Sequence, residues 1–73
     1  MSDVTNKIAV FRSLLKISQQ DLANAIGVSR KTISTVETGR FTPSVTIALK
    51  LALFFETSVE ELFSLNEPDN LES

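Results

Sequence analysis

The sequence predicts an all-α fold, a compact bundle of five short helices in one small domain. Three observations favour this class. Apolar residues recur at helical spacing, and no segment shows the alternation that is typical of a half-buried strand. Serines at positions 18, 29, 44 and 58 stand directly before such runs, and serine is a preferred N-cap residue. Gly27 follows one of the runs, at a position that commonly requires φ > 0, and Gly39 ends another.

The first two helices are expected over residues 4–15 and from residue 19 onward. The first helix has an apolar stripe at helical spacing, made of Val4, Ile8, Phe11 and Leu15. Ser18 caps the second helix. Its buried side is expected to contain Leu22, Ala25 and Ile26, and Ala23 is small where two helices must cross closely.

The third helix begins after Ser29 and ends at Gly39, and Ile33 and Val36 turn one of its sides inward. The fourth begins near Ser44 and extends to about residue 55. The fifth opens at residue 58, where Ser-Val-Glu-Glu has the form of a capping box. We assign residues 1–65 to the folded domain, and residues 66–73 to an acidic, flexible C-terminal tail.

Composition excludes several classes of protein. The 73 residues contain no Cys and no His, so disulfides, the usual zinc sites and most nucleophile–base pairs cannot form. We therefore expect no enzyme activity, no catalytic residues, no metal and no cofactor. No signal peptide is visible, and the longest apolar runs are too short to span a bilayer. A cytoplasmic location with no membrane partner is expected.

Charge is distributed unevenly along the chain. The formal net charge is −2, which is unusual for a protein that binds nucleic acid. However, residues 1–56 hold all seven basic residues and four acids, whereas residues 57–73 hold five acids and no base. The first part therefore carries a local positive charge that can attract DNA phosphates, with modest affinity.

The segment from Gln19 to Gly39 has the form of two short helices joined by a tight turn. Four polar residues of the second helix, on the side opposite its buried stripe, lie within an arc of about 140° on a helical wheel. They are Arg30, Lys31, Ser34 and Thr35. Such side chains can contact base edges and phosphates, but taken alone the pattern equally describes an ordinary solvated helix face.

This segment resembles the helix-turn-helix of the Cro and lambda-repressor family, also called the xenobiotic-response-element family of bacterial regulators. The resemblance rests on an ordered set of residues: Gln19, Ala23, Gly27, Ile33, Glu37 and Gly39. Arg12 upstream, Pro43-Ser44 downstream and a closing Val-Glu-Glu-Leu at 59–62 extend it over residues 8 to 65. It implies a lambda-repressor-like fold and a DNA-binding regulator.

The resemblance also implies individual contacts with double-stranded DNA. Its base-contacting positions correspond to Ser29, Arg30, Lys31, Ser34 and Thr35. Because Arg and Lys favour guanine O6 and N7, the half-site is expected to contain G·C pairs. Phosphate contacts are implied for Gln19, Arg40, Thr42 and, more weakly, Lys16. Arg12 and Glu37 are expected to form a structural ion pair that orients neighbouring groups and adds little net stability.

The fourth helix carries more apolar residues than one core can bury. The family pattern turns Ala48, Leu51, Ala52 and Phe55 inward. The excess is assigned to a dimer interface of Ile47, Leu53, Phe54, Phe63 and Leu65. Cover by the C-terminal segment folding back is the alternative. The family generally acts as a dimer, which favours the interface.

These inferences predict a transcriptional regulator that acts as a repressor, binding a palindromic operator as a homodimer. The alternative is a protein-interaction module, such as an antitoxin, that binds a partner protein of unknown identity and for which DNA binding is secondary. The acidic C-terminal segment would then hold the partner.

Overall fold

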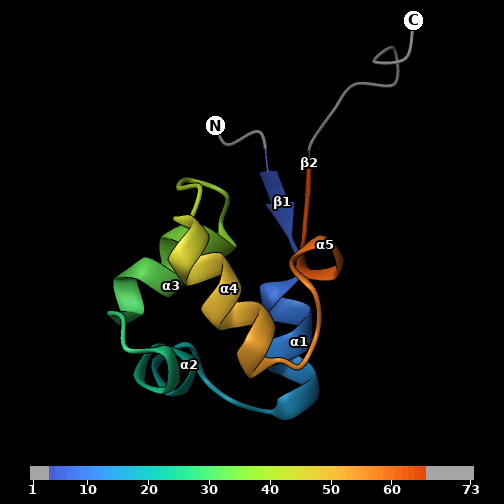
Figure 1. Cartoon of the computed structure of the whole chain (residues 1–73). Helices are drawn as coiled ribbons and strands as arrows, with labels where there is room; N and C mark the ends of the chain where they lie inside the picture. The colour runs from blue at the N-terminus through green and yellow to red at the C-terminus, as the bar shows by residue number, and fades with distance from the viewer. Residues whose placement is uncertain (1–3, 66–73) are drawn as a thin grey trace, which may run out of the picture.

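The computed structural model describes residues 4–65, which form five helices and two short strands (Figure 1). In chain order these elements are β1 (Val4–Asn6), α1 (Ile8–Leu15), α2 (Gln19–Ile26), α3 (Arg30–Glu37), α4 (Val45–Phe54), α5 (Val59–Leu62) and β2 (Phe63–Leu65). Five helices confirm the main expectation. The tail expected over residues 66–73 lies outside the described residues.

The fold departs from all-α by a small antiparallel sheet, which the sequence analysis did not predict. Strands β1 and β2 bring the two ends of the domain together, and Figure 1 shows them side by side, away from α2. The paired residues are Val4 with Leu65, Thr5 with Ser64 and Asn6 with Phe63. The Lys7 N–H continues the pairing, because it donates to the Leu62 carbonyl at 2.9 Å.

The first helix begins at Ile8 and not at Val4, and the side chain of Asn6 explains the difference. Its Oδ1 accepts a hydrogen bond from the Ile8 N–H at 3.0 Å, which satisfies a backbone donor of the first helical turn. Its Nδ2 donates to the Val36 carbonyl at 2.9 Å. Asn6 therefore separates strand from helix and ties both to the end of α3.

The core lies where all five helices meet. Its fully buried members are Ile8, Leu22, Ala23, Ile33, Val36, Leu51 and Leu62, and Ile26 joins them with little exposure. Two expected core residues are not there. Leu15, the last residue of α1, is half exposed, and Ala25 is exposed although the following residue, Ile26, is buried; Ala23 takes the inward position on α2 instead.

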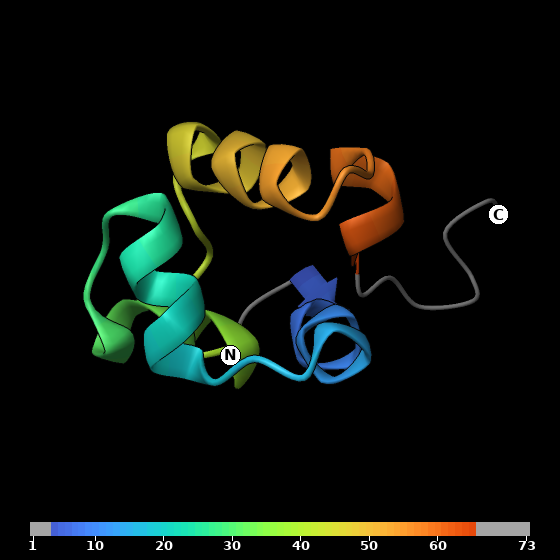
Figure 2. The ribbon, with the colours of Figure 1, turned by 90° about the horizontal axis from the view of Figure 1, so that it is seen from below.

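Helices α4 and α5 follow one another along one side of the molecule (Figure 2). Helices α2 and α3 lie at one end, and α1 lies on the side opposite α4 and α5. Leu51 and Ala52 are buried, as expected, and the ring of Phe55 lies 5.4 Å from that of Phe11 on α1. Ser58 Oγ accepts a hydrogen bond from the Glu61 N–H, which is the serine half of the capping box expected at α5. No helix within residues 4–65 has both the length and the apolar character needed to cross a membrane.

Candidate nucleic-acid interface

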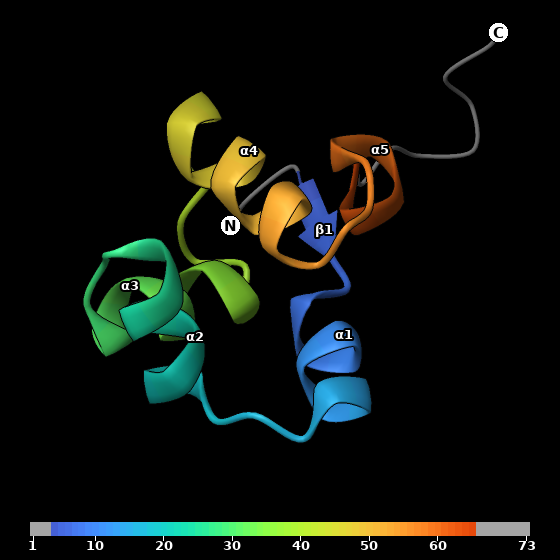
Figure 3. The ribbon, with the colours of Figure 1, turned by 60° about the horizontal axis from the view of Figure 1, so that its bottom comes forward.

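Helices α2 and α3 form a compact unit whose turn depends on one glycine (Figure 3). Gly27 has φ +77°, in the left-handed region, so the prediction for this residue is confirmed. Its N–H and that of Val28 both donate to the Ala23 carbonyl, at 2.9 and 3.0 Å. Ala23 itself is fully buried, which agrees with a close crossing of the two helices.

Both helices begin with a serine cap. Ser18 Oγ accepts from the Asp21 N–H at 2.9 Å, and the Asp21 carboxylate accepts from the Ser18 N–H at 3.1 Å, which completes a capping box. Ser29 Oγ accepts from the Thr32 N–H at 3.1 Å. These caps set where each helix begins and therefore which way its side chains face.

Helix α3 buries Ile33 and Val36 against the core, so its opposite side faces outward. Arg30 and Lys31 are exposed there, and Ser34 and Thr35 are partly exposed. The structure therefore brings these four predicted base-contacting residues to one surface. Ser29 lies at the start of the same helix, where it serves as the cap.

The outward side of α3 carries positive charge that is not neutralised internally. Within residues 4–65, the side chains of Lys31 and Arg40 form no hydrogen bond or ion pair. Between residues 29 and 42 the one acidic residue is Glu37. Its side chain is only 8% exposed and is turned toward Arg12, so the surface presents cations to a polyanion.

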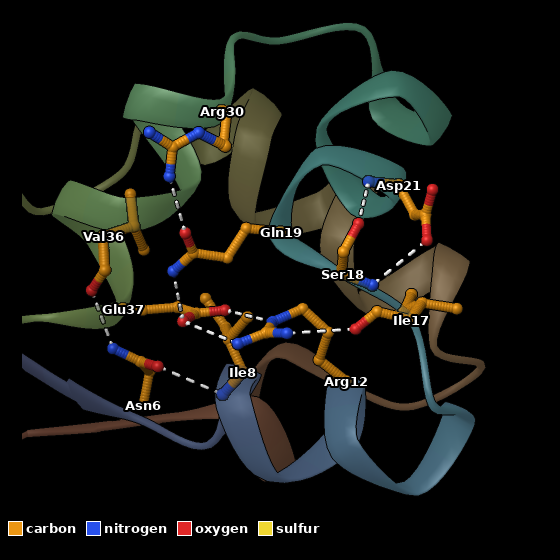
Figure 4. A network of polar contacts seen from close by, with 10 residues as sticks. All are labelled: Asn6, Ile8, Arg12, Ile17, Ser18, Gln19, Asp21, Arg30, Val36 and Glu37. Carbon is orange, nitrogen blue, oxygen red and sulfur yellow. Dashed lines mark hydrogen bonds and ion pairs between the residues drawn. The ribbon is translucent and has the colours of Figure 1, made fainter.

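Arg12 and Glu37 form a bidentate ion pair between α1 and the end of α3 (Figure 4). Arg12 Nε lies 2.8 Å from Glu37 Oε2, and Nη2 lies 3.3 Å from Oε1. The third nitrogen, Nη1, donates to the Ile17 carbonyl at 3.0 Å. The hydrogen bond with Glu37 raises the pKa of the Arg12 guanidinium, while desolvation opposes this shift. The pair holds α3 against α1 and the α1–α2 turn.

Gln19 extends this pair to Arg30 on the outward side of α3. Its Nε2 donates to Glu37 Oε1 at 3.0 Å, and its Oε1 accepts from Arg30 Nη1 at 3.2 Å (Figure 4). Only one orientation of the Gln19 amide satisfies both contacts, because the Glu37 carboxylate can only accept a hydrogen bond and the Arg30 guanidinium can only donate one. A continuous chain of contacts therefore runs from Arg12 through Glu37 and Gln19 to Arg30.

The hydroxyls of the predicted base readers are partly engaged within α3. Thr35 Oγ1 donates to the carbonyls of Lys31 and Thr32, at 3.0 and 3.1 Å. Ser29 Oγ lies 2.9 Å from Thr32 Oγ1, besides accepting from the Thr32 N–H. Each hydroxyl keeps acceptor capacity, but the Thr35 proton is already used. The charged side chains exposed on this side of α3 are Arg30 and Lys31.

Of the four residues predicted to contact phosphate, Lys16 precedes the α2–α3 unit in the chain, Gln19 begins it, and Arg40 and Thr42 follow it. Lys16 ends α1 in a left-handed conformation, and Gln19 begins α2. Arg40 and Thr42 lie in the loop between α3 and α4. Gln19 uses one amide hydrogen on Glu37 and retains a second for a phosphate oxygen. The Asp21 carboxylate adds negative charge at the same helix end, which weakens the attraction expected there.

The five residues predicted for a dimer interface differ in exposure. Leu53 is 80% exposed and Leu65 is 63% exposed. Ile47, Phe54 and Phe63 are half-buried and pack against the core. Phe54 also makes an edge contact with Phe55, at a centroid distance of 5.1 Å. Any interface would therefore use Leu53 and Leu65 first.

The structure adds residues that the sequence analysis did not assign. Exposed apolar residues on α4 recur every four positions and form a stripe of Val45, Leu49 and Leu53. On α1, exposed apolar residues form a second patch of Val10, Leu14 and Leu15. Phe41 is half exposed beside α3 and lines a hollow with Lys31 and Thr35. Period-four spacing in the sequence could have indicated the α4 stripe.

Comparisons with known proteins agree with this geometry. A family model described as Helix-turn-helix matches residues 8–62. An uncharacterised HTH-type transcriptional regulator of Methanocaldococcus jannaschii is 43% identical over 58 residues, covering 80% of this chain and 88% of that protein. YgzD, an uncharacterised HTH-type transcriptional regulator of Bacillus subtilis, is 36% identical over 62 residues, covering 85% and 94%.

A solved structure shares the fold. A crystallised protein from Bacteroides fragilis superposes with a TM-score of 0.74, over 84% of this chain and 98% of that one. Its sequence identity is 24%, so the likeness concerns the arrangement of the elements.

Proposed function

The chain belongs to the Cro and lambda-repressor type of the helix-turn-helix family, a family of DNA-binding transcription regulators, and we propose that α3 reads a specific operator. In this proposal the protein binds double-stranded DNA as a homodimer on an approximately palindromic operator. Occupancy of the operator then represses transcription from an overlapping promoter.

The observation that carries the proposal is the chemistry of the outward side of α3. Arg30 and Lys31 stand at the start of this helix, where side chains reach base edges when a recognition helix lies in the major groove. Arg40 adds a cation in the following loop, and Glu37 is withdrawn into its pair with Arg12. This cationic surface on α3 favours an interpretation as a base-recognising surface over one as an ordinary solvated helix face.

Homodimerisation is supported by the exposed leucines of α4 and β2. An eight-residue recognition helix covers only a few base pairs, so one domain gives a short and weakly specific site. Two copies related by a two-fold axis would read two half-sites about one DNA turn apart. Burial of Leu53 and Leu65 in the seam would remove the two leucines of the predicted interface that are now in water.

Selection from a pool of random duplexes tests this function. We expect the wild-type protein to enrich an approximate palindrome with half-sites about 10 base pairs apart. Anisotropy titration should then give an affinity at least ~10³-fold higher than for a scrambled duplex, with binding that weakens as salt increases. Equal affinity for both duplexes at all salt concentrations would contradict sequence-specific binding.

A protein-interaction module is the second candidate, and the apolar patch on α1 favours it. Val10, Leu14 and Leu15 are 56%, 73% and 52% exposed on a helix outside the α2–α3 unit. A partner protein could cover this patch while α3 remains available. If Leu14→Glu left specific DNA binding intact but abolished repression of a reporter, regulation would depend on a partner at α1.

A further inference from the structure

The hollow beside α3 combines an aromatic wall with residues of the DNA-facing surface. It has a volume of about 240 Å³ and is lined by Ser29, Lys31, Thr32, Thr35 and Phe41. Three of these, Ser29, Lys31 and Thr35, are predicted to contact bases. The other two come from α3 itself and from the loop that follows it. The hollow is therefore continuous with the proposed interface.

The polar groups of the hollow are largely satisfied by the protein. Thr35 donates its hydroxyl proton to the helix backbone, and the hydroxyls of Ser29 and Thr32 bond to one another. The hydroxyls keep acceptor capacity, and a ligand would also meet the methyl-bearing threonine side chains, the half-exposed ring of Phe41 and the ammonium group of Lys31. This is an apolar slot with a cation at its rim.

We propose that this slot reads the C5-methyl group of a thymine in the major groove, and that Phe41 is a specificity-determining residue. The inference rests on the proposed function, because the slot meets DNA only if α3 does. Thymine is the one standard base with a methyl group in the major groove, and aromatic and threonine methyl contacts favour it. The Lys31 ammonium at the rim can contact a neighbouring guanine or a phosphate.

Duplex DNA fits the slot better than a free apolar ligand. The surface around the slot carries Lys31 and Arg40, and within residues 29–42 the one acid faces away from it. The slot shares Ser29, Lys31 and Thr35 with the residues predicted to contact bases, so a base edge placed against α3 would also meet the slot. Its volume of about 240 Å³ is many times the roughly 10–15 Å³ that one water requires by a comparable measure, which leaves room for a methyl group and its pyrimidine edge.

Uracil scanning of the selected duplex tests the proposal without altering the protein. Each thymine is replaced in turn by uracil, which removes only the methyl group. At one thymine in each half-site we expect affinity to fall roughly fourfold, the value that loss of one buried methylene-sized group predicts. Substitution in both half-sites should lower affinity more than tenfold, because distant sites add.

Phe41→Ala assigns the effect to this residue. The variant should bind the thymine duplex more weakly than the wild type and should no longer distinguish thymine from uracil at that position. Phe41→Leu, which keeps an apolar wall, should retain part of the distinction. Val45→Ala is the matched control, because Val45 is an exposed apolar residue nearby in the chain that does not line the slot.

The outcomes separate this inference from the proposed function. If a specific site is selected but no uracil substitution weakens wild-type binding, the proposed contact with a thymine methyl group is wrong. The proposed function as a sequence-specific DNA-binding regulator is then retained. If uracil weakens the wild type and Phe41→Ala equally, another residue reads the methyl and the assignment to Phe41 is overturned. If no duplex is enriched at all, the proposed function fails, and the inference fails with it.

Discussion

Arg30 Nη1 donates a hydrogen bond to Gln19 Oε1 at 3.2 Å, so the first residue of α3 is held by the first residue of α2. Gln19 is held in turn by Glu37, whose carboxylate pairs with Arg12 (Figure 4). The guanidinium of Arg30 therefore has an acceptor in the free protein, which would reduce the side-chain entropy lost if Arg30 contacts a base as proposed. Guanine O6 and N7 are the base acceptors that arginine most often contacts in the major groove.

Replacement of the two cations at the start of α3 should weaken specific binding. We expect Arg30→Ala and Lys31→Ala each to cost about 1–3 kcal/mol with the selected duplex, because each removes a contact to a base edge. The fold should be unaffected, since both side chains are exposed. Anisotropy titration gives the affinities and circular dichroism the fold. An unchanged affinity for either variant would contradict its base-reading role.

Gln19→Ala should reduce both affinity and discrimination. A phosphate contact alone would make this variant weaker for all sequences by a similar factor. The hydrogen bond to Arg30 adds a second effect, because the guanidinium loses its acceptor and becomes less ordered. Selection with the variant should therefore relax the preference at the base pair that Arg30 reads. An unchanged preference would leave Gln19 with the phosphate role only.

The Arg12–Glu37 pair should show coupling in a double-mutant cycle. Arg12→Met leaves the carboxylate of Glu37, which is 8% exposed, with Gln19 as its remaining partner. We expect a loss of about 1–3 kcal/mol in the free energy of unfolding for this variant, and less when Glu37→Gln accompanies it. Urea denaturation of the four proteins gives the coupling. A coupling of zero would show that the pair contributes nothing to stability.

Local features of the sequence predicted the α2–α3 unit well. Gly27 follows the apolar run of α2, and Ile33 and Val36 mark the buried side of α3. Such signals involve neighbouring residues, so they survive without knowledge of the fold. Gly39 was predicted to end the third helix, and α3 ends close to it, at Glu37 with Thr38 as the C-cap.

Features that depend on distant residues could not be predicted in the same way. Val4 pairs with Leu65 at the opposite end of the domain, and three-residue strands carry almost no sequence pattern. The pairing of Arg12 with Glu37 was expected only from family resemblance. The contact between Gln19 and Arg30 depends on how α2 and α3 pack, and so does the slot beside Phe41.

Gly27→Val should destabilise the domain by more than about 1 kcal/mol, because a β-branched residue is poorly tolerated at φ +77°. A Cβ at this position would meet no atom within 4 Å, so the cost comes from the backbone conformation and not from a clash. Gly27→Asn is the matched control, since asparagine enters the left-handed region more easily. Thermal unfolding should rank the proteins as wild type, Asn variant, Val variant. Equal stability of the two variants would contradict this explanation.

Leu53→Glu should convert the proposed dimer into folded monomers. Leu53 is 80% exposed in the single chain, so the glutamate should leave the subunit stable, whereas in a two-fold seam it would bring two like charges together. Phe54→Glu tests the same seam less cleanly, because Phe54 also packs against the core and Phe55. Leu14→Glu on α1 is the matched control, since Leu14 is 73% exposed and lies outside the proposed seam.

Analytical ultracentrifugation at micromolar concentration should show dimers for the wild type and the Leu14 variant and monomers for the Leu53 variant. The monomers should bind the palindrome with sharply reduced affinity, because only one half-site is then read at a time. A wild type that is monomeric without DNA would overturn the preformed dimer and restrict pairing of the subunits to the operator itself.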